Sequence, residues 1–122
     1  MSEPKIVIKR VYDDVDEADG QRVLVDRLWP RGLSKAQAEL DHWFKEVAPS
    51  SELRTWFDHD PDRFDEFAKR YEHELDDDAH AEEVDRLIEL IHNNDRVTLL
   101  YAAKDDDVNH AKVLQDYLRR HS

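Results

Sequence analysis

The sequence has no cysteine and only two glycines among its 122 residues. Without cysteine, the chain cannot form a disulfide, hold a metal through thiolates or use a thiol as a nucleophile. With so little glycine, it also lacks a glycine-rich loop of the kind that cradles phosphate groups. We therefore expect a cytoplasmic protein whose fold depends on an apolar core of its own.

Long apolar runs are missing as well. No stretch approaches the roughly 20 apolar residues that a membrane-spanning helix needs, and no apolar run follows a basic start as in a signal peptide. The chain carries 30 acidic and 18 basic residues, which gives a net charge of −12. Because so acidic a surface repels phosphate backbones and anionic lipids, we expect neither a nucleic acid nor a membrane as partner. The composition does not predict the oligomeric state.

Three short apolar runs predict strands at residues 6–8, 23–25 and 97–103. The third run is apolar on both alternating faces, so it should form a central strand that is covered on both sides. The acidic segment 13–20 is expected to be a solvated hairpin or loop. It does not fit a calcium-binding loop, since Val15 would stand at the first ligand position.

Helix starts are marked by residues that cap helices. Ser34 and either Ser50 or Ser51 can cap short helices, and Asp60 followed by Pro61 predicts the start of a longer one. Apolar residues at helical spacing continue from there, and they predict two further helices, the last at about residues 108–119. The order of elements predicts one α/β domain over residues 1–122. Its sheet should have about three to four mainly parallel strands flanked by helices.

Polar side chains follow two of the predicted strands at their carboxyl ends. Arg27 and Arg31 come after the second apolar run, and Lys104 and Asp105 come after the third. In open parallel sheets, ligands bind outside the carboxyl ends of the strands. If the two strands are parallel, both loops open on the same edge of the sheet and form one cationic site.

The start of the last predicted helix belongs to the same edge. Asn109 and His110 lie in its first turn, where free N–H groups and the helix dipole favour an anion. A histidine can give or take a proton near neutral pH, so Lys104, Asp105 and His110 are candidates for acid–base chemistry.

Each candidate also has a structural alternative. Arg27 can pair with Asp26 or another acid, Arg31 can be a surface charge, and His110 can serve only the helix start. The run of residues 58–60 contains metal-binding types, but three adjacent side chains rarely converge on one ion, and we predict neither a metal nor a cofactor. Several other histidines are expected on solvated helix faces, namely His73, His80, His92 and His121.

Four stretches together resemble the YeaO-like branch of the domain-of-unknown-function family 488 across nearly the whole chain. They are Asp-Arg-Leu-Trp-Pro-Arg-Gly at 26–32, Lys-Glu-Val-Ala-Pro-Ser at 45–50, the run 53–61, and the run 99–111 with Asn109-His110-Ala111. The resemblance implies a bacterial or archaeal α/β domain, with no activity attached to it. The signature polar residues of the family fall here on Arg27, Arg31, Arg54, Lys104, Asp105 and Asn109.

A related, longer branch of that family carries a Cys-His-Arg run after its last strand. The equivalent stretch here is Asn109-His110-Ala111, which keeps only the histidine. Thiol chemistry in that branch therefore cannot be transferred to this chain.

Three hypotheses follow, and the first is an enzyme that acts on a small substrate bearing a phosphate or carboxylate. Its catalytic residues would be Lys104, Asp105 and His110, and its binding residues Arg27, Arg31, Arg54 and Asn109. The second is a non-catalytic module that binds a nucleotide or another phosphate ligand at the same place. In the third, the motif residues are purely structural and hold the long loop of residues 27–50.

Overall fold

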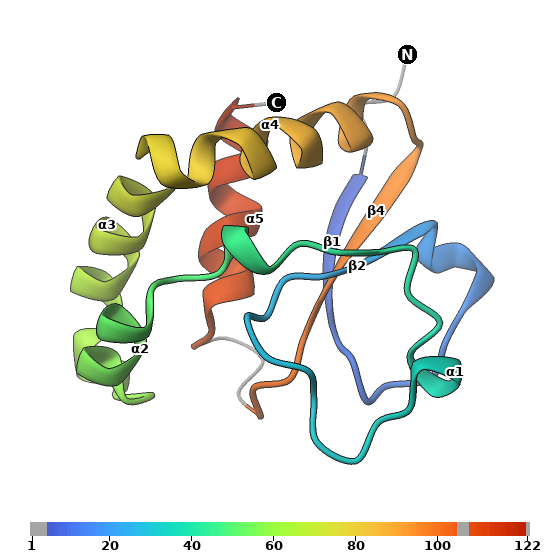
Figure 1. The fold of residues 1–122 in the computed structure, drawn as a ribbon, viewed down its shortest axis with the longest axis horizontal. Helices are drawn as coiled ribbons and strands as arrows, with labels where there is room; N and C mark the ends of the chain where they lie inside the picture. Colours follow the sequence, from blue (N-terminus) through green and yellow to red (C-terminus); the bar gives the residue numbers. More distant parts are fainter. Residues whose placement is uncertain (1–4, 105–107, 122) are drawn as a thin grey trace.

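The computed structural model describes residues 5–104 and 108–121, which form an α/β domain (Figure 1). The strands are β1 (Lys5–Arg10), β2 (Gln21–Leu24), β3 (His42–Trp43) and β4 (Arg96–Tyr101). The α-helices are α1 (Lys35–Ala38), α2 (Ser51–Phe57), α3 (Phe64–Leu75), α4 (Asp78–His92) and α5 (His110–His121). Three 3-10 turns complete the described elements, η1 (Glu17–Asp19), η2 (Lys45–Val47) and η3 (Pro61–Arg63). In this part of the chain, no helix has the length and apolar character needed to cross a membrane.

The four strands form one parallel sheet in the order β1-β4-β2-β3. The prediction of an α/β domain with three to four mainly parallel strands is confirmed. The hairpin alternative for residues 13–20 is wrong, because β1 and β2 run in the same direction with β4 between them. The connection instead ends at Gly20, whose φ is +66°, and a Cβ there would lie 2.3 Å from the carbonyl oxygen of Arg96.

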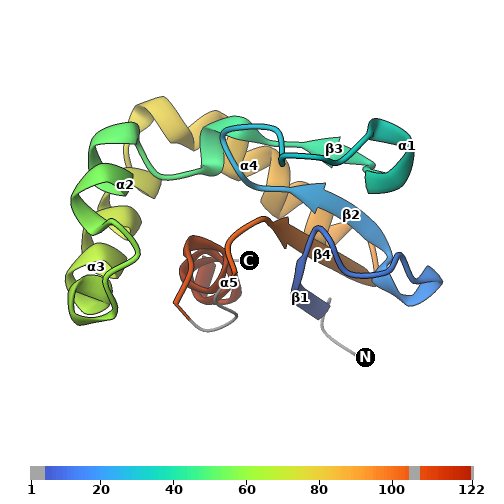
Figure 2. The same cartoon turned by 90° about the horizontal axis from the view of Figure 1, so that it is seen from below.

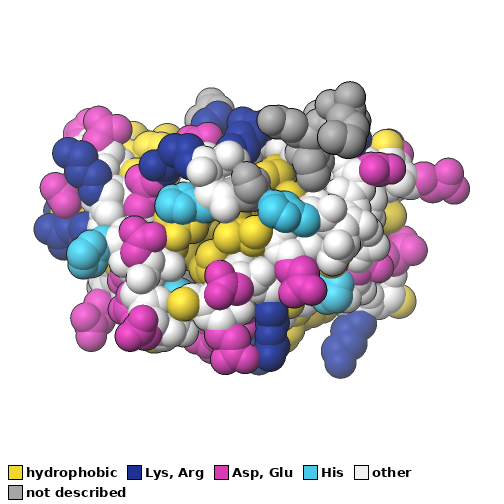
Figure 3. Space-filling view, turned by 90° about the horizontal axis from the view of Figure 1, so that it is seen from above, with side chains coloured by type: hydrophobic (Ala, Val, Ile, Leu, Met, Phe, Trp, Pro, Cys, Tyr) yellow, Lys and Arg dark blue, Asp and Glu magenta, His cyan; other side chains and the backbone are white. Residues whose placement is uncertain are grey.

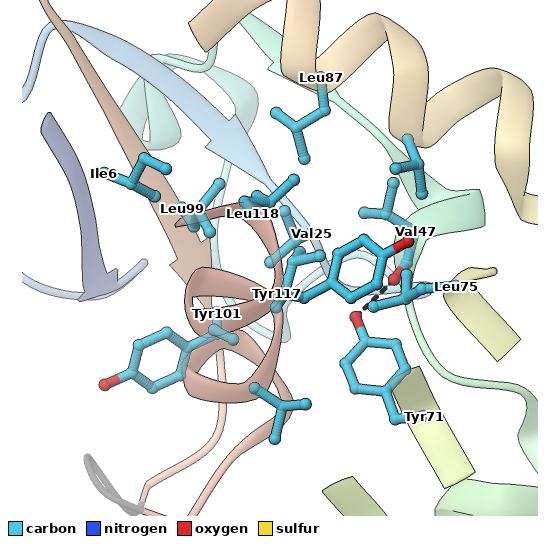
Figure 4. Packing of buried hydrophobic residues seen from close by; sticks show 14 of the residues in the cluster. Ile6, Val25, Val47, Tyr71, Leu75, Leu87, Leu99, Tyr101, Tyr117 and Leu118 are labelled. Carbon is cyan, nitrogen blue, oxygen red and sulfur yellow. Dashed lines mark hydrogen bonds between the residues drawn. The ribbon is translucent and has the colours of Figure 1, made fainter. Parts of the chain in front are cut away.

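The two faces of the sheet are covered differently. On one face, alternate side chains of β2 and β4 such as Val23 and Leu99 pack against buried residues of α3, α4 and α5 (Figure 4). On the other face, Leu24 and Leu100 pack with residues of the long loop between β2 and β3. Strand β4 is therefore central and buried on both sides, as its apolar sequence predicts.

The predicted helix caps are present. The hydroxyl of Ser34 accepts a hydrogen bond from the Gln37 N–H at 3.1 Å, and that of Ser50 accepts from the Leu53 N–H at 3.2 Å. Asp60 caps the η3 turn, which leads directly into α3. These bonds satisfy N–H groups that the helices themselves leave free, which is why the starts could be predicted.

Two regions differ from the sequence-based expectations. Strand β3 was not predicted, because its two residues are too few to produce a strand pattern, and only its pairing with β2 defines it. His80 is buried rather than solvated. It lies in the first turn of α4, and this helix packs against η2, where a Glu83 oxygen accepts the Glu46 N–H at 2.8 Å.

An ion-pair network lies near the amino end of β2, and it includes Asp19 of the segment 13–20 that was expected to be solvated. Arg22 donates from Nη1 to an Asp19 oxygen at 2.5 Å and from Nε and Nη2 to the Ala38 carbonyl at 3.2 and 2.9 Å. Lys9 Nζ lies 3.2 Å from the other Asp19 oxygen. Burial alone would raise the pKa of Asp19, but hydrogen bonds from the Asp16 N–H, Lys9 and Arg22 outweigh it and lower that pKa. Asp19 and Arg22 are therefore part of the folded core.

Candidate functional site

A pocket of about 690 Å³ lies at the carboxyl ends of β2 and β4. Figure 2 views the molecule from below, toward this end of the strands. The walls of the pocket come from the loop after β2, the segment before α2, helices α2 and α3, the loop after β4 and the start of α5. Because β2 and β4 are parallel neighbours, segments far apart in the sequence meet here.

Five of the seven predicted site residues line this pocket, namely Arg27, Arg54, Lys104, Asn109 and His110. Of the other two, the structure describes only Arg31. Arg31 is exposed and absent from the lining, and its carbonyl oxygen accepts a hydrogen bond from the Tyr12 hydroxyl at 2.9 Å. Asp105 lies outside the described residues.

Arg27 is held at one wall of the pocket by partial contacts. Its Nη2 donates to the Ala48 carbonyl at 3.3 Å, and its Nη1 lies 3.7 Å from a Glu46 oxygen. Its Nε is buried and has no hydrogen-bond partner among the described residues. The structural alternative of an ion pair with a nearby acid is present, and the acid is Glu46 rather than Asp26.

Arg54 comes from helix α2 and shows the same pattern. Its Nη2 donates to the Ser51 hydroxyl at 3.2 Å, while its Nε is buried without a hydrogen-bond partner in the described part of the chain. A buried donor that lacks an acceptor costs about 1–3 kcal/mol, and more when the group is charged. The two arginines thus bring two unsatisfied charged donors to one pocket.

His110 and Asp26 form a pair at the inner end of the pocket. Asp26 accepts the Ala102 N–H through Oδ2 at 3.0 Å, and its Oδ1 lies 3.1 Å from His110 Nε2. The Val25 carbonyl oxygen also lies 3.1 Å from this nitrogen. Because both neighbours of Nε2 are acceptors, Nε2 carries a proton, and the neutral ring has its lone pair on Nδ1.

Tyr71 lies behind this pair and is fully buried. Its hydroxyl donates to the Val47 carbonyl at 2.5 Å, the dashed contact between these two residues in Figure 4. Burial, and then the negative charges of Glu74 and Asp26, raise the pKa of Tyr71 well above its usual range. Tyr71 therefore stays a neutral phenol and orders the wall rather than acting as a base.

Asn109 and Lys104 occupy the last wall in different ways. Asn109 is buried, and its Oδ1 accepts the Lys112 N–H at 2.9 Å, which caps helix α5. Lys104 is exposed at the end of the β4 loop. Asn109 thus has a structural role as the cap of α5, whereas the exposed side chain of Lys104 can attract an anion.

The remaining residues that line the pocket are largely apolar. They were not identified as site residues from the sequence. Phe57 and Phe67 stack with ring centroids 4.2 Å apart and reach the pocket from α2 and α3. Their helical spacing marked them only as core residues. Asp26 and His59 also line the pocket; the position of Asp26 directly after the second predicted strand was the signal that could have identified it.

The fold and the site define a small parallel α/β domain with an arginine-lined pocket at the carboxyl ends of its strands. The chain belongs to domain-of-unknown-function family 488, and a family model described as the "Inactive DUF488-N3 subclade" matches residues 5–122. This match confirms the family that the sequence motifs suggest.

Relatives of similar length have similar sequences. An uncharacterised protein of Mycobacterium tuberculosis strain H37Rv is 46% identical over 116 residues, which cover 95% of each chain. The uncharacterised protein YeaO of Escherichia coli K12 is 46% identical over 114 residues, which cover 93% of this chain and 96% of YeaO. No solved structure matches the chain.

Proposed function

We propose that this protein binds a small anion, bearing a carboxylate or a phosphate, in the pocket at the carboxyl ends of β2 and β4. One observation carries the proposal. Arg27 and Arg54 both line the pocket, and each has a buried Nε that no described residue satisfies. An anion beside these guanidinium groups would balance their charge, and guanidinium groups bind carboxylates and phosphates through paired N–H donors.

The charges on the pocket wall support the same proposal. Arg27, Arg54 and Lys104 bring three cationic side chains, and Asp26 is the one carboxylate among the described lining residues. The Oδ2 of Asp26 accepts the Ala102 N–H, and its Oδ1 is buried 3.1 Å from His110 Nε2 without a hydrogen bond to any described residue. A cleft lined by one sign of charge can concentrate its counter-ion even on a protein with a net charge of −12.

We favour binding without turnover as the first reading. The subclade whose model matches the chain is described as inactive, and the chain has no cysteine to replace the thiol of the related branch. Under this proposal, the anion is held by the two arginines, and His110 contributes little to affinity.

A second candidate function, an enzyme acting on the bound anion, is favoured by the Asp26–His110 pair. A histidine that a carboxylate orients through one ring nitrogen is the usual arrangement for a general acid or base. His110 would then accept a proton from the substrate at Nδ1 and return it from the same nitrogen, with Lys104 and Asp105 as further candidates. A substrate that His110→Ala binds normally but no longer converts would favour this second function.

The proposal is tested by calorimetric titration with four probes: inorganic phosphate, acetate, phenyl phosphate and benzoate. We expect at least one probe to bind wild type, and Arg27→Ala and Arg54→Ala each to weaken it by roughly 10- to 150-fold, the loss of one charge-assisted hydrogen bond. Arg86→Ala is the matched control, since Arg86 is exposed and paired with Glu82 outside the pocket. Unchanged dissociation constants in both pocket variants, or no binding by wild type, would overturn the proposal.

We also propose that nucleic acids and anionic membranes are not partners, and that the protein works in the cytoplasm. The net charge of −12 and the lack of cysteine support both statements. On the face that carries α4, basic side chains lie at separate places among acidic ones rather than in one continuous patch (Figure 3). An electrophoretic mobility assay with double-stranded DNA and RNA should show no complex at physiological salt.

A further inference from the structure

We infer that the anion carries an apolar body, such as an aryl or short acyl group, that fills the pocket beside the two arginines. This inference rests on the proposed binding function and narrows it to one chemical class. It depends on three features of the same pocket: its size, its apolar wall and the small number of hydrogen-bond acceptors that its side chains leave open to a ligand.

The size of the pocket exceeds the needs of a bare anion. Its volume of about 690 Å³ lies within the range of pockets that enclose a ligand of many heavy atoms. A phosphate or acetate ion held at Arg27 and Arg54 would leave most of this space to water. A ligand with a body of its own would displace that water and bury more of its surface.

The wall of the pocket matches an apolar body. Seven of the fourteen described lining residues are apolar, and they include Leu28, Pro49, Phe57 and Phe67. Leu28 is 67% exposed, the highest value among the large apolar side chains that are exposed in the described residues. An exposed leucine beside a cationic pocket gains most from a ligand that covers it with apolar atoms.

The polar groups of the pocket are poorly placed to bind a ligand with many hydroxyl groups. Asp26 accepts the Ala102 N–H through Oδ2, and its Oδ1 is buried beside His110 without a hydrogen-bond partner among the described residues. The Oδ1 of Asn109 already accepts the Lys112 N–H. Since few acceptors remain for hydroxyl groups, a polyhydroxylated body such as a sugar would lose hydrogen bonds to water without replacing them.

The test compares ligands that share an anionic group and differ in the body. Affinities for wild type are measured by titration with inorganic phosphate, phenyl phosphate and ribose 5-phosphate, and with acetate and benzoate. We expect the aryl ligand of at least one series to bind tenfold or more tightly than its bare anion, and phenyl phosphate to bind more tightly than ribose 5-phosphate.

The outcomes separate this inference from the proposed function. If bare anions or ribose 5-phosphate bind as tightly as the aryl ligands, the inference of an apolar body is overturned, while the proposal of anion binding stands. If none of the five probes binds, both statements are overturned.

A pair of surface variants tests the wall itself without disturbing the core. Leu28→Ser should weaken the aryl ligand about threefold or more and leave the affinity for its bare anion unchanged. Val15→Ser is the matched control, because Val15 is also an exposed apolar residue but does not line the pocket. Equal affinities of Leu28→Ser and Val15→Ser for the aryl ligand would overturn the assignment of Leu28 to the binding wall.

Discussion

Strand β2 has an arginine network near its amino end and another just beyond its carboxyl end, and the two differ in how far the guanidinium groups are satisfied. Arg22 is 4% exposed, and its Nε, Nη1 and Nη2 all donate to Asp19 or to backbone carbonyls. The side chain of Arg27 is 27% exposed, and its Nε has no partner among the described residues. The first arrangement holds the fold together, whereas the second leaves a charged donor without a partner among the described residues. An arginine whose N–H groups are all hydrogen-bonded thus indicates a structural role, whereas one with an unpaired N–H group is a candidate for binding.

Removing the arginine at the amino end should have the largest effect on stability. Arg22→Ala takes one partner from a buried pair and leaves the Asp19 carboxylate without its closest cation. We expect the free energy of unfolding to fall by about 3–5 kcal/mol, measured by urea denaturation. A loss below about 1 kcal/mol would contradict the view that this network is part of the core.

Removing the arginine at the carboxyl end should affect binding more than folding. Arg27→Ala should weaken binding of the best anionic probe by about 1.5–3 kcal/mol, the contribution of a charge-assisted hydrogen bond. Its free energy of unfolding should fall by less than about 1.5 kcal/mol, because the variant loses only one weak bond to Ala48 and a half-exposed ion pair. A loss of 3–5 kcal/mol in urea denaturation would instead favour the structural reading of the motif.

Acid should act on the amino-end network more than on the pocket. Because the pKa of Asp19 is lower in the folded state than its unfolded value of about 3.9, its stabilising effect is complete above that value. That stability is lost as the pH falls through the lowered folded-state pKa. We expect the unfolding free energy of wild type to fall more steeply below pH 4 than that of Asp19→Asn. Parallel pH profiles of the two proteins would contradict this assignment.

The smallest effect is expected at the acidic neighbour of Arg27. Glu46 is 57% exposed and lies 3.7 Å from the guanidinium group, so the pair adds little stability. Glu46→Gln should change the free energy of unfolding by less than about 0.5 kcal/mol. Loss of the competing negative charge should also tighten anion binding slightly, by less than about tenfold, in the same titration. Weaker anion binding by Glu46→Gln would show that Arg27 needs this pair to be positioned.

The carboxyl-end site could be predicted to a large extent from the sequence, because parallel strands place their carboxyl ends together. That rule joined Arg27 to Lys104 and His110, and the helical spacing of apolar residues located α5 to within about two residues of its start. Arg54 was added only by resemblance to the family, since nothing in the spacing of a short helix shows which side chain faces a pocket.

Other features could not be predicted because they depend on long-range packing. Arg31 follows the same strand as Arg27, but only the course of the loop decides that it stays exposed. Asp19 lies in an acidic run that is typical of a solvated loop, and its burial depends on the later Arg22 and on Thr98 of β4, whose hydroxyl donates to the Asp19 carbonyl at 2.7 Å. Such contacts are made between elements, so local sequence patterns do not indicate them.

The most direct test of the central claim observes the arginine Nε–H groups themselves while an anion is added. Nitrogen-15 NMR spectra of the arginine side chains can be assigned with Arg27→Lys, Arg54→Lys and Arg22→Lys and then followed during titration with phenyl phosphate. We predict that the Nε–H signals of Arg27 and Arg54 shift in a saturable way while that of Arg22, already hydrogen-bonded, stays in place. Unmoved Arg27 and Arg54 signals at saturating probe, or equal shifts at Arg22, would contradict an anion site at this end of the sheet.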